Sequence, residues 1–361
     1  MACPFAQLSP LLLLSFLALF FQFGASFFSP KPLMASLQRG RSFSGSSSSR
    51  SRAASPPPHH EGSRGGGKSD GGRSGGHRMF GVAGVLAPPE QQQRASSEPE
   101  DLDGEVLPWT ESMGAGGPLH YAELMRWYVD ALQVGLSLDR VSCPLAMDTA
   151  VNPTKKARVR NVVYTGDCVR KVRTSYLDTP GMQVFSSMAY GSPSRDLPLL
   201  GISAMAMPRA RALFLDFQPL LPGPEYAEKY AEMYAKLGAV RERHPRLNEG
   251  LQREYFQGSP FFSEHMVSVR WTLEDEASGF MEDVILPAFQ ECVQIYVDTV
   301  SRAQAHGLES VPKKVVLERH AEFDRYHAER EQVRPMMTAN FGASFAESYV
   351  SEFLFAYGFN R

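Results

Sequence analysis

The sequence contains few cysteines, and they are not spaced as metal ligands or disulfide partners. Its 361 residues include Cys3, Cys143, Cys168 and Cys292, with no Cys-x-x-Cys pair. Protein-bound iron–sulfur clusters usually take four cysteine thiolates, so we expect none here once Cys3 is removed with a leader. The spacing also argues against a zinc knuckle and a disulfide framework. Any electrons that this protein uses must therefore come from outside it.

The sequence also lacks a net excess of positive charge. Lysine and arginine number 37 against 39 aspartates and glutamates, which gives a formal net charge of −2. This balance argues against nucleic acid as the main partner. The charge is unevenly distributed, because residues 27–79 hold nine basic and two acidic residues and leave residues 80–361 with a net charge of about −9. We therefore expect the folded part to be acidic.

The composition itself is ordinary for a globular protein. Hydrophobic residues make up 43% of the chain and aromatic residues 11%, which excludes a fibre, a collagen and a disordered chain. No period of 20 to 50 residues repeats along the sequence, so a solenoid or propeller is not expected.

The N-terminus has the features of two targeting segments in series. Residues 11–21 are apolar and are followed by Gly-Ala-Ser at 24–26. This run is too short to span a bilayer comfortably and is typical of a signal peptide over 1–26. Residues 27–79 are rich in Ser, Arg and Gly, as in a transit peptide. The junction resembles the bipartite leader of algae with secondary plastids. We expect location in the plastid stroma with no membrane association after processing; a secreted protein with a disordered linker is the alternative.

Residues 80–118 are rich in Gly, Pro, Gln and Glu and show no periodic apolar pattern. This composition predicts a flexible linker, followed by one domain over residues 119–361. The glycine-rich stretch at 114–117 neither follows a strand pattern nor begins a βαβ unit, so a nucleotide-binding loop is not indicated.

The domain changes its hydrophobic period along the chain. The apolar spacing is helical from Tyr121 to Leu136, and the following segments have a period of two. Their connections are too short for crossover helices, which predicts an antiparallel meander. The predicted strands are Arg160–Tyr164, Arg170–Leu177, Met182–Tyr190, Leu199–Met207 and Ala212–Phe217, and a helix at 224–240, a strand at His265–Trp271 and helices near 280–305, 311–333 and 335–355 follow. Strands followed by helices indicate an α+β fold.

Four colinear segments of the domain share motifs with one known family. They are Met182–Tyr190, Leu213–Leu220 with its Leu-Asp-Phe-Gln-Pro-Leu, Phe261–Arg270 with its Phe-Phe-Ser, and Phe341–Phe355 with its Glu-Phe-Leu-Phe. Together they resemble the ferredoxin-dependent bilin reductases over roughly residues 120–356. The first two segments are most similar to the enzyme that reduces biliverdin to 15,16-dihydrobiliverdin. The Phe-Phe-Ser stretch is equally similar to the next enzyme, which makes phycoerythrobilin.

This resemblance implies a three-layer α/β/α sandwich around a central antiparallel sheet. Its substrate would be a linear tetrapyrrole held between the sheet and the C-terminal helices. No bound cofactor is implied, because reduced ferredoxin delivers single electrons from outside and side chains supply protons. This agrees with the missing cluster motif. The implied partners are ferredoxin and the tetrapyrrole, and the next bilin reductase of the pathway is a further partner to consider.

The activity implied is the two-electron reduction of biliverdin to 15,16-dihydrobiliverdin in phycobilin biosynthesis. Two alternatives stay open. One is a phycoerythrobilin:ferredoxin oxidoreductase that acts on dihydrobiliverdin, and the other is a relative that binds a bilin without reducing it. The second alternative arises because the sequence departs from the family at both of its proton-donating aspartates.

Ser203 and Glu331 occupy the positions of those two aspartates. A serine hydroxyl is not a mild acid, but it can orient a water or hydrogen-bond a pyrrole nitrogen or lactam oxygen. Glu331 keeps the carboxyl group one methylene further out, and a carboxyl kept neutral by an apolar pocket suits protonation of a reduced bilin. The resemblance therefore implies both as catalytic residues. The alternatives are that Glu331 is a solvated charge on a helix surface and that the Ser203 hydroxyl is bonded to backbone.

Four further residues are implied as substrate contacts. Arg270 matches a family arginine whose planar fork can bind a propionate, although a surface ion pair would explain it equally well. Ser186 replaces an asparagine of the related enzyme and can face the pigment or fill the sheet. Ser263, in the Phe-Phe-Ser stretch, and Arg334, which follows Glu331, complete the predicted set.

Docking of an acidic ferredoxin to an acidic domain requires a local basic patch. Two groups of basic residues could supply it. The larger contains Lys155, Lys156, Arg158, Arg160, Arg170, Lys171 and Arg173, and the smaller contains Lys313 and Lys314. A solvated sheet edge would explain the larger group equally well.

Overall fold

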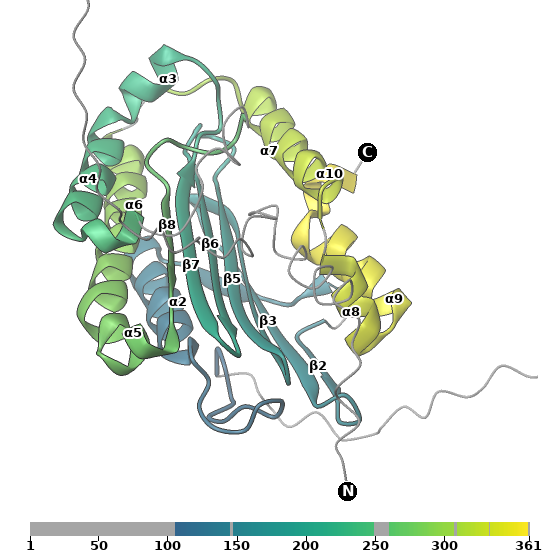
Figure 1. Ribbon diagram of the computed structural model, residues 1–361. Coiled ribbons are helices and arrows are strands. Elements are labelled where there is room, and N and C mark those ends of the chain that lie inside the picture. Colours follow the sequence, from purple (N-terminus) through teal and green to yellow (C-terminus); the bar gives the residue numbers. More distant parts are fainter. Residues whose placement is uncertain (1–104, 145–146, 249–259, 307–308, 332, 360–361) are drawn as a thin grey trace, which may run out of the picture. The chain divides into compact units, whose positions relative to one another are not determined.

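The computed structural model describes residues 105–144, 147–248, 260–306, 309–331 and 333–359 (Figure 1). The predicted signal peptide, the predicted transit peptide and most of the predicted linker lie outside these residues. All described residues belong to one compact unit.

An eight-stranded antiparallel sheet forms the centre of this unit. The strand order is β1-β3-β4-β5-β6-β7-β8, and β2 also pairs with β3. The strands are β1 (Asp139–Val141), β2 (Thr149–Asn152), β3 (Ala157–Thr165), β4 (Val169–Thr179), β5 (Met182–Gly191), β6 (Leu199–Met207), β7 (Ala210–Gln218) and β8 (Val267–Trp271). The predicted meander from β3 to β7 is confirmed. Strands β1 and β2 were not predicted, because three or four residues are too few to establish a period of two.

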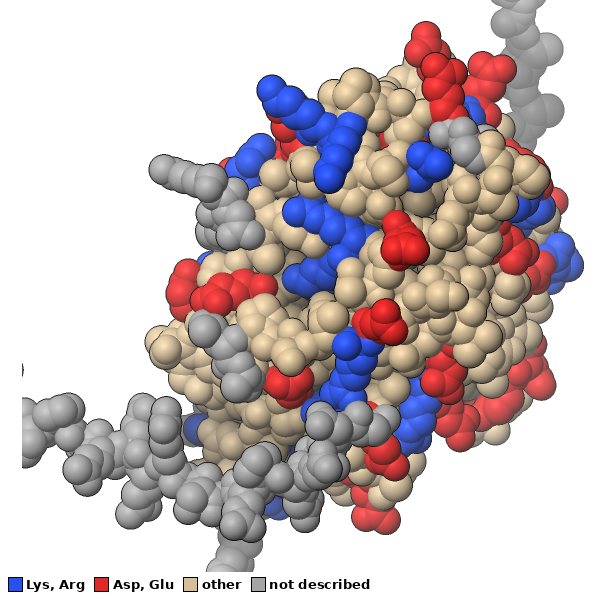
Figure 2. All heavy atoms as spheres, turned by 180° about the vertical axis from the view of Figure 1, so that it is seen from behind, with Lys and Arg blue, Asp and Glu red and all other residues tan. Residues whose placement is uncertain are grey.

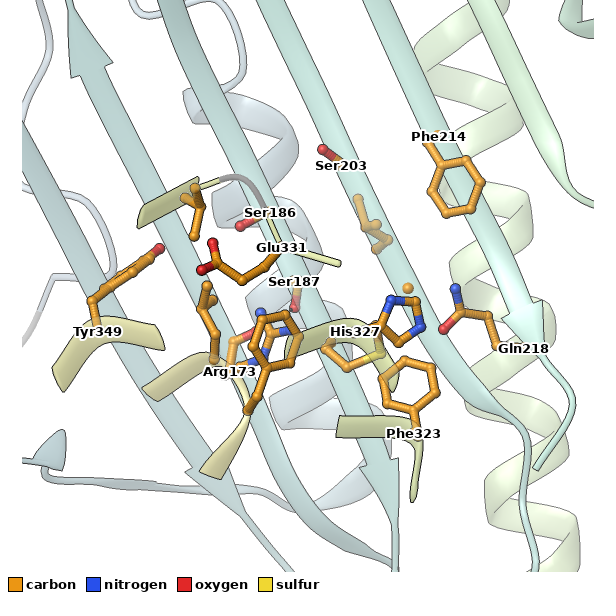
Figure 3. Close-up of a pocket in the computed structure, with 16 residues that line it drawn as sticks. Arg173, Ser186, Ser187, Ser203, Phe214, Gln218, Phe323, His327, Glu331 and Tyr349 are labelled. Atoms are coloured by element: carbon orange, nitrogen blue, oxygen red, sulfur yellow. Dashed lines mark hydrogen bonds between the residues drawn. The ribbon is translucent and has the colours of Figure 1, made fainter. Parts of the chain in front are cut away.

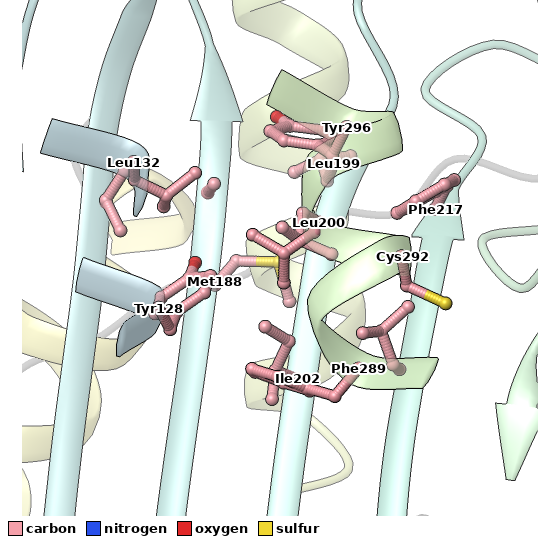
Figure 4. Close-up of a cluster of buried hydrophobic side chains, with 14 of the residues drawn as sticks. Tyr128, Leu132, Met188, Leu199, Leu200, Ile202, Phe217, Phe289, Cys292 and Tyr296 are labelled. Carbon is pink, nitrogen blue, oxygen red and sulfur yellow. The ribbon is translucent and has the colours of Figure 1, made fainter. Parts of the chain in front are cut away.

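Helices cover one face of the sheet with an apolar layer. This layer contains α2 (Ala122–Leu136), α3 (Pro224–Lys229), α4 (Ala231–Arg243), α5 (Leu273–Ala277), a π-helix at Met281–Ile285 and α6 (Leu286–His306). Figure 4 shows Tyr128 of α2 and Phe289 of α6 packed on Leu200 and Ile202 of β6. The Tyr128 and Phe289 ring centroids are 6.3 Å apart. Burial of these large side chains is the main stabilisation of the domain.

The C-terminal helices lie against the opposite face (Figure 1). They are α7 (Lys313–Ala328), α8 (Val333–Phe341), α9 (Ala343–Ser348), a π-helix at Tyr349–Leu354 and α10 (Ala356–Phe359). The helix predicted near 335–355 is interrupted at Gly342, whose φ of 93° favours glycine. Helices on both faces confirm the α+β class and the three-layer sandwich.

Residues 105–118 pack against the sheet and correct the predicted domain boundary. Leu107 is buried. Asp178 of β4 accepts hydrogen bonds from the Ser112 hydroxyl at 2.6 Å and from the Met113 backbone N–H at 2.8 Å. The same carboxylate pairs with Arg158 at 3.0 Å. This end of the predicted linker is therefore part of the domain. The polar composition of the segment did not indicate this packing.

Within the ranges that the structure describes, no helix combines the length and the apolar character needed to cross a membrane. The same residues contain no cluster of His, Cys, Asp or Glu arranged to hold a metal ion.

Candidate functional site

A pocket lies between the sheet and the C-terminal helices (Figure 3). The space between these elements is about 830 Å³, including space open to solvent at its mouth. Strands β4 to β7 form its floor. The first part of its roof is α7, with Phe323 and His327, and the rest comes from Glu331 and the segment from Val333 to Phe355.

The strand register places two rows of side chains across this floor. In one row, Ser175, Ser186, Ser203 and Phe214 are directly opposite one another on β4, β5, β6 and β7. In the next row, Arg173, Met188, Gly201 and Asp216 are opposite one another on the same strands. Because side chains alternate between the two faces, both rows point toward the C-terminal helices. Gly201 lets the Met188 and Gln218 side chains pack close to the floor, since a Cβ there would meet them at 3.2–3.3 Å.

Ser203 and Ser186 both line the pocket, as the resemblance implied. The Ser203 side chain is buried, and its hydroxyl has no hydrogen-bond partner among the described residues. A buried hydroxyl without a partner is costly unless a ligand or a water satisfies it. The alternative of a serine bonded to backbone is therefore not what the structure shows for Ser203.

Glu331 also lines the pocket, and its side chain is only 8% exposed. It precedes α8 and accepts hydrogen bonds from the Arg334 backbone N–H and Nε, each at 2.9 Å. Both contacts stabilise the negatively charged carboxylate, and the first caps the helix N-terminus. Glu331 is therefore not a solvated surface charge, and Arg334 acts on it rather than on the pocket.

Ser263, Arg270 and Arg334 are not among the residues that line the pocket. Ser263 donates hydrogen bonds from its backbone N–H (2.9 Å) and its hydroxyl to Asp216. Arg270 lies opposite Ala212 in the β7–β8 ladder, one row beyond the serine row and on the same face. Arg334 also pairs with Glu347. The prediction that these three contact the substrate is not confirmed by this geometry.

The pocket contains functional residues that the sequence analysis did not single out as pocket residues. Arg173 and Gln218 are buried in the floor, and neither Arg173 Nε nor Gln218 Oε1 has a partner among the described residues. His327 lies in the roof, where burial lowers its pKa to about 3, with a smaller contribution from Arg173. The imidazole is therefore neutral at pH 7. Arg173 and Ser175 are two residues apart on β4 and therefore lie on the same face of the sheet. This spacing was the only sequence feature that could have placed Arg173 near the pocket.

Two buried aspartates lie beside the pocket without lining it. Burial raises the pKa of Asp216 to about 7, against the hydrogen bonds from Ser263. Burial also raises the pKa of Asp324 to about 6; its carboxylate accepts from the Tyr190 hydroxyl at 2.6 Å and from the Tyr357 N–H at 2.9 Å. Asp216 thus has a structural role, because it joins β7 to the segment at Ser263.

The larger basic group does not form the surface patch that was considered for ferredoxin docking. Arg158, Arg160 and Arg173 are buried, while Lys155 and Lys156 are exposed. These arginines are buried because other parts of the chain cover both faces of β3 and β4, which the sequence spacing does not show. Lys313 and Lys314, in the first turn of α7, are exposed.

Comparisons with known proteins agree on one family. Residues 128–356 match the family described as ferredoxin-dependent bilin reductase. The chain is 30% identical over 211 residues to the 15,16-dihydrobiliverdin:ferredoxin oxidoreductase of Nostoc punctiforme, covering 58% of this chain and 81% of that protein. It is 27% identical over 188 residues to a phycoerythrobilin:ferredoxin oxidoreductase of Prochlorococcus marinus, covering 52% of this chain and 72% of that one.

A solved structure shares the fold. The crystal structure of tomato phytochromobilin synthase in complex with biliverdin superimposes with a TM-score of 0.55 at 18% sequence identity, and the match covers 66% of this chain and 83% of that one. The sheet and its two helical layers thus define an α/β/α sandwich with a pocket between the sheet and the C-terminal helices. The chain belongs to the ferredoxin-dependent bilin reductase family and is an oxidoreductase that uses ferredoxin as its electron donor.

Proposed function

We propose that this protein reduces biliverdin to 15,16-dihydrobiliverdin, taking two electrons from ferredoxin and adding two protons. The observation that carries the proposal is a pocket lined by both Glu331 and Ser203, whose hydroxyl has no hydrogen-bond partner among the described residues. Relatives named 15,16-dihydrobiliverdin:ferredoxin oxidoreductase recur among the similar proteins, which favours this product over phycoerythrobilin. The pocket can hold the pigment between the sheet and the C-terminal helices.

The proposed protons enter from the roof of the pocket. Glu331 is the carboxyl group that lines it, and Arg334 fixes the position of that group. The carboxylate takes a proton from water and passes it to the reduced pigment, which is a stronger base than the oxidised pigment. Ser203 hydrogen-bonds a lactam oxygen, a pyrrole nitrogen or an ordered water. Ser186 lies opposite Ser203 and extends the same polar floor.

The electrons arrive singly from outside, and we propose that the protein binds no cofactor of its own. Figure 2 shows basic side chains in a broken band across the middle of one face of the molecule, with acidic side chains mostly toward one edge of it. Such local separation of charge can orient an acidic partner despite the acidic net charge. Lys313 and Lys314 remain exposed candidates for docking contacts.

The location and the pathway partner are also proposals. The two targeting segments of the sequence support import into the plastid stroma, and a reporter fused to residues 1–80 that stayed in the endomembrane lumen would contradict this. Transfer of the product to the next bilin reductase follows from the chemistry, since dihydrobiliverdin is that enzyme's substrate.

Anaerobic incubation with biliverdin, and separately with dihydrobiliverdin, tests the proposed activity. Each pigment is mixed with the protein and reduced ferredoxin, and the products are separated by chromatography. We expect biliverdin to give 15,16-dihydrobiliverdin and dihydrobiliverdin to remain unchanged. Conversion of dihydrobiliverdin alone would favour phycoerythrobilin formation, and a stable complex without a product would indicate a binding protein.

The binding-protein alternative has one structural observation in its favour. The Glu331 carboxyl group already accepts two hydrogen bonds from Arg334, and Ser203 is not an acid. A pocket of this kind can bind a pigment even if protonation is slow. The absence of any product from either pigment would therefore select this alternative.

A further inference from the structure

Arg173 is a buried cation that faces the pocket. It is 6% exposed and forms part of the floor. Its Nε has no hydrogen-bond partner, and its guanidinium no carboxylate partner within 4 Å, among the residues that the structure describes. Its guanidinium lies near an aromatic ring, since Cζ is 5.7 Å from the centroid of Phe355.

The other buried arginines among the described residues each have a carboxylate within ion-pair distance or several hydrogen-bond acceptors. Arg158 pairs with Asp178 at 3.0 Å, and Arg211 Nε lies 2.7 Å from Glu276. Arg160 donates to the Thr149 hydroxyl at 2.9 Å and to the backbone carbonyl of Glu105 at 3.0 Å. Burying a charge without a counter-charge is costly, so proteins rarely leave a guanidinium in this state. Arg173 lacks such a partner, which indicates that its counter-charge is a negative charge on the bound ligand.

The neighbouring groups do not supply that charge. Asp324 is within electrostatic reach of Arg173, but its two oxygens accept hydrogen bonds from Tyr190 and Tyr357. The next floor positions are Met188 and Gly201, which are uncharged, and Asp216 at the end of this row accepts hydrogen bonds from Ser263. Glu331 lines the same pocket, but its ion-pair partner is Arg334. Lys171 lies on the same face of β4 and donates to the Phe353 carbonyl at 2.9 Å, so it adds a second positive charge.

We propose that Arg173 stabilises the negative charge that the bound pigment gains when it accepts an electron, an inference that rests on the proposed function. Reduced ferredoxin loses one electron and becomes oxidised, and the pigment gains that electron and becomes a radical anion before it is protonated. The propionate charges of a bilin sit on flexible arms that can stay in water. Charge within the ring system appears only on reduction, and a fixed cation in the sheet floor is already positioned for it.

The serines of the adjacent row support this role. Ser186 and Ser203 are not acids, so neither of them can neutralise the new charge by proton transfer. A cation that needs no reorganisation lowers the energy of the reduced pigment most effectively inside a pocket of low polarity. Arg173 would then be a catalytic residue for electron uptake rather than for protonation.

Arg173→Gln, with Arg173→Lys beside it, tests this assignment. The readouts are the dissociation constant of biliverdin, the rate of radical formation after mixing with reduced ferredoxin, and the midpoint potential of the bound pigment. We expect Arg173→Gln to change the dissociation constant by less than about threefold, to slow radical formation by about 30-fold or more, and to shift the potential to more negative values. Arg173→Lys should recover part of the rate.

Arg160→Gln is the matched control, because it removes a buried guanidinium from the opposite face of the same sheet. It should leave the rate and the potential unchanged. Thermal unfolding of each variant separates loss of folding from loss of function.

A binding role would give a different pattern and overturn the proposal. Binding weakened more than tenfold by Arg173→Gln, at an unchanged rate with saturating pigment, would assign Arg173 to a substrate carboxylate. Biliverdin dimethyl ester, which lacks both carboxylates, should then bind poorly to the wild-type protein. Its dissociation constant for Arg173→Gln should be no larger than for the wild type. If ferredoxin fails to reduce pigment bound to the wild-type protein, the proposed function fails, while the potential of the bound pigment still decides the role of Arg173. A wild-type protein that binds no pigment overturns both.

Discussion

Single residues decide what this pocket can do, and Glu331 is the one whose loss should affect protonation most. We expect Glu331→Gln to lower turnover about 100-fold or more, because an amide cannot deliver a proton. Its oxygen can still accept from the Arg334 N–H, so α8 should keep its cap. The measurement is kcat with biliverdin and reduced ferredoxin. Glu329→Gln is the control, since Glu329 is exposed and pairs with Arg330; equal activity of both variants would remove Glu331 from the proton path.

Ser203 should matter for the ligand and hardly at all for folding. Its hydroxyl has no partner among the residues that were described, so Ser203→Ala should change the free energy of unfolding by less than about 1 kcal/mol. Loss of one hydrogen bond to the pigment should weaken binding about 3- to 10-fold. Denaturant unfolding and absorption titration measure the two effects. Ser187→Ala gives the contrast, because that hydroxyl bonds Tyr128 and the Arg173 carbonyl at 2.9 Å. A large loss of stability in Ser203→Ala would show that the hydroxyl is satisfied within the protein.

Asp216 should make stability depend on pH. Its pKa is about 7 in the folded protein against 3.8 ordinarily, so the folded state keeps a proton that the unfolded chain releases. Its contribution to stability is therefore full below about pH 4 and is lost as the pH rises to about 7, at up to about 1.4 kcal/mol per pH unit. Asp216→Asn removes this group. Urea unfolding from pH 4 to 8 should show the wild type losing stability relative to the variant; parallel curves would contradict the raised pKa.

At the scale of elements, the segment before α2 should be needed for full stability. A chain that begins at residue 119 loses the burial of Leu107 and two hydrogen bonds to Asp178. We expect it to be less stable than a chain beginning at residue 105 by at least about 3 kcal/mol. Chemical denaturation of the two chains measures the difference. Equal midpoints would restore the predicted linker boundary at residue 118.

Elements with long periodic patterns could be predicted from the sequence, and short or context-dependent ones could not. The strands from β3 to β7 matched because nine to eleven residues establish a period of two. The basic residues of β3 and β4 were wrongly expected to form a surface patch, because sequence spacing does not show whether both faces of a strand are covered. Ser186, Ser203 and Glu331 were found through family motifs. Arg173 was missed as a pocket residue because its role depends on the register of four strands and on the roof that covers it.

At the scale of the whole molecule, we propose a sandwich that holds a linear tetrapyrrole under its C-terminal helices and receives electrons from a separate protein. The pocket supplies position, hydrogen bonds and a buried cation, while ferredoxin supplies the reducing power. This division is consistent with membership of the ferredoxin-dependent bilin reductase family.

The most direct test is the absorption spectrum of the anaerobic protein–biliverdin complex before and after reduced ferredoxin is added. Reduction of the 15,16 double bond shortens the conjugated system, so we expect the long-wavelength band to move to shorter wavelength as two electrons are consumed for each pigment. A spectrum that stays unchanged after ferredoxin is added, or a pigment that never binds, would contradict the account.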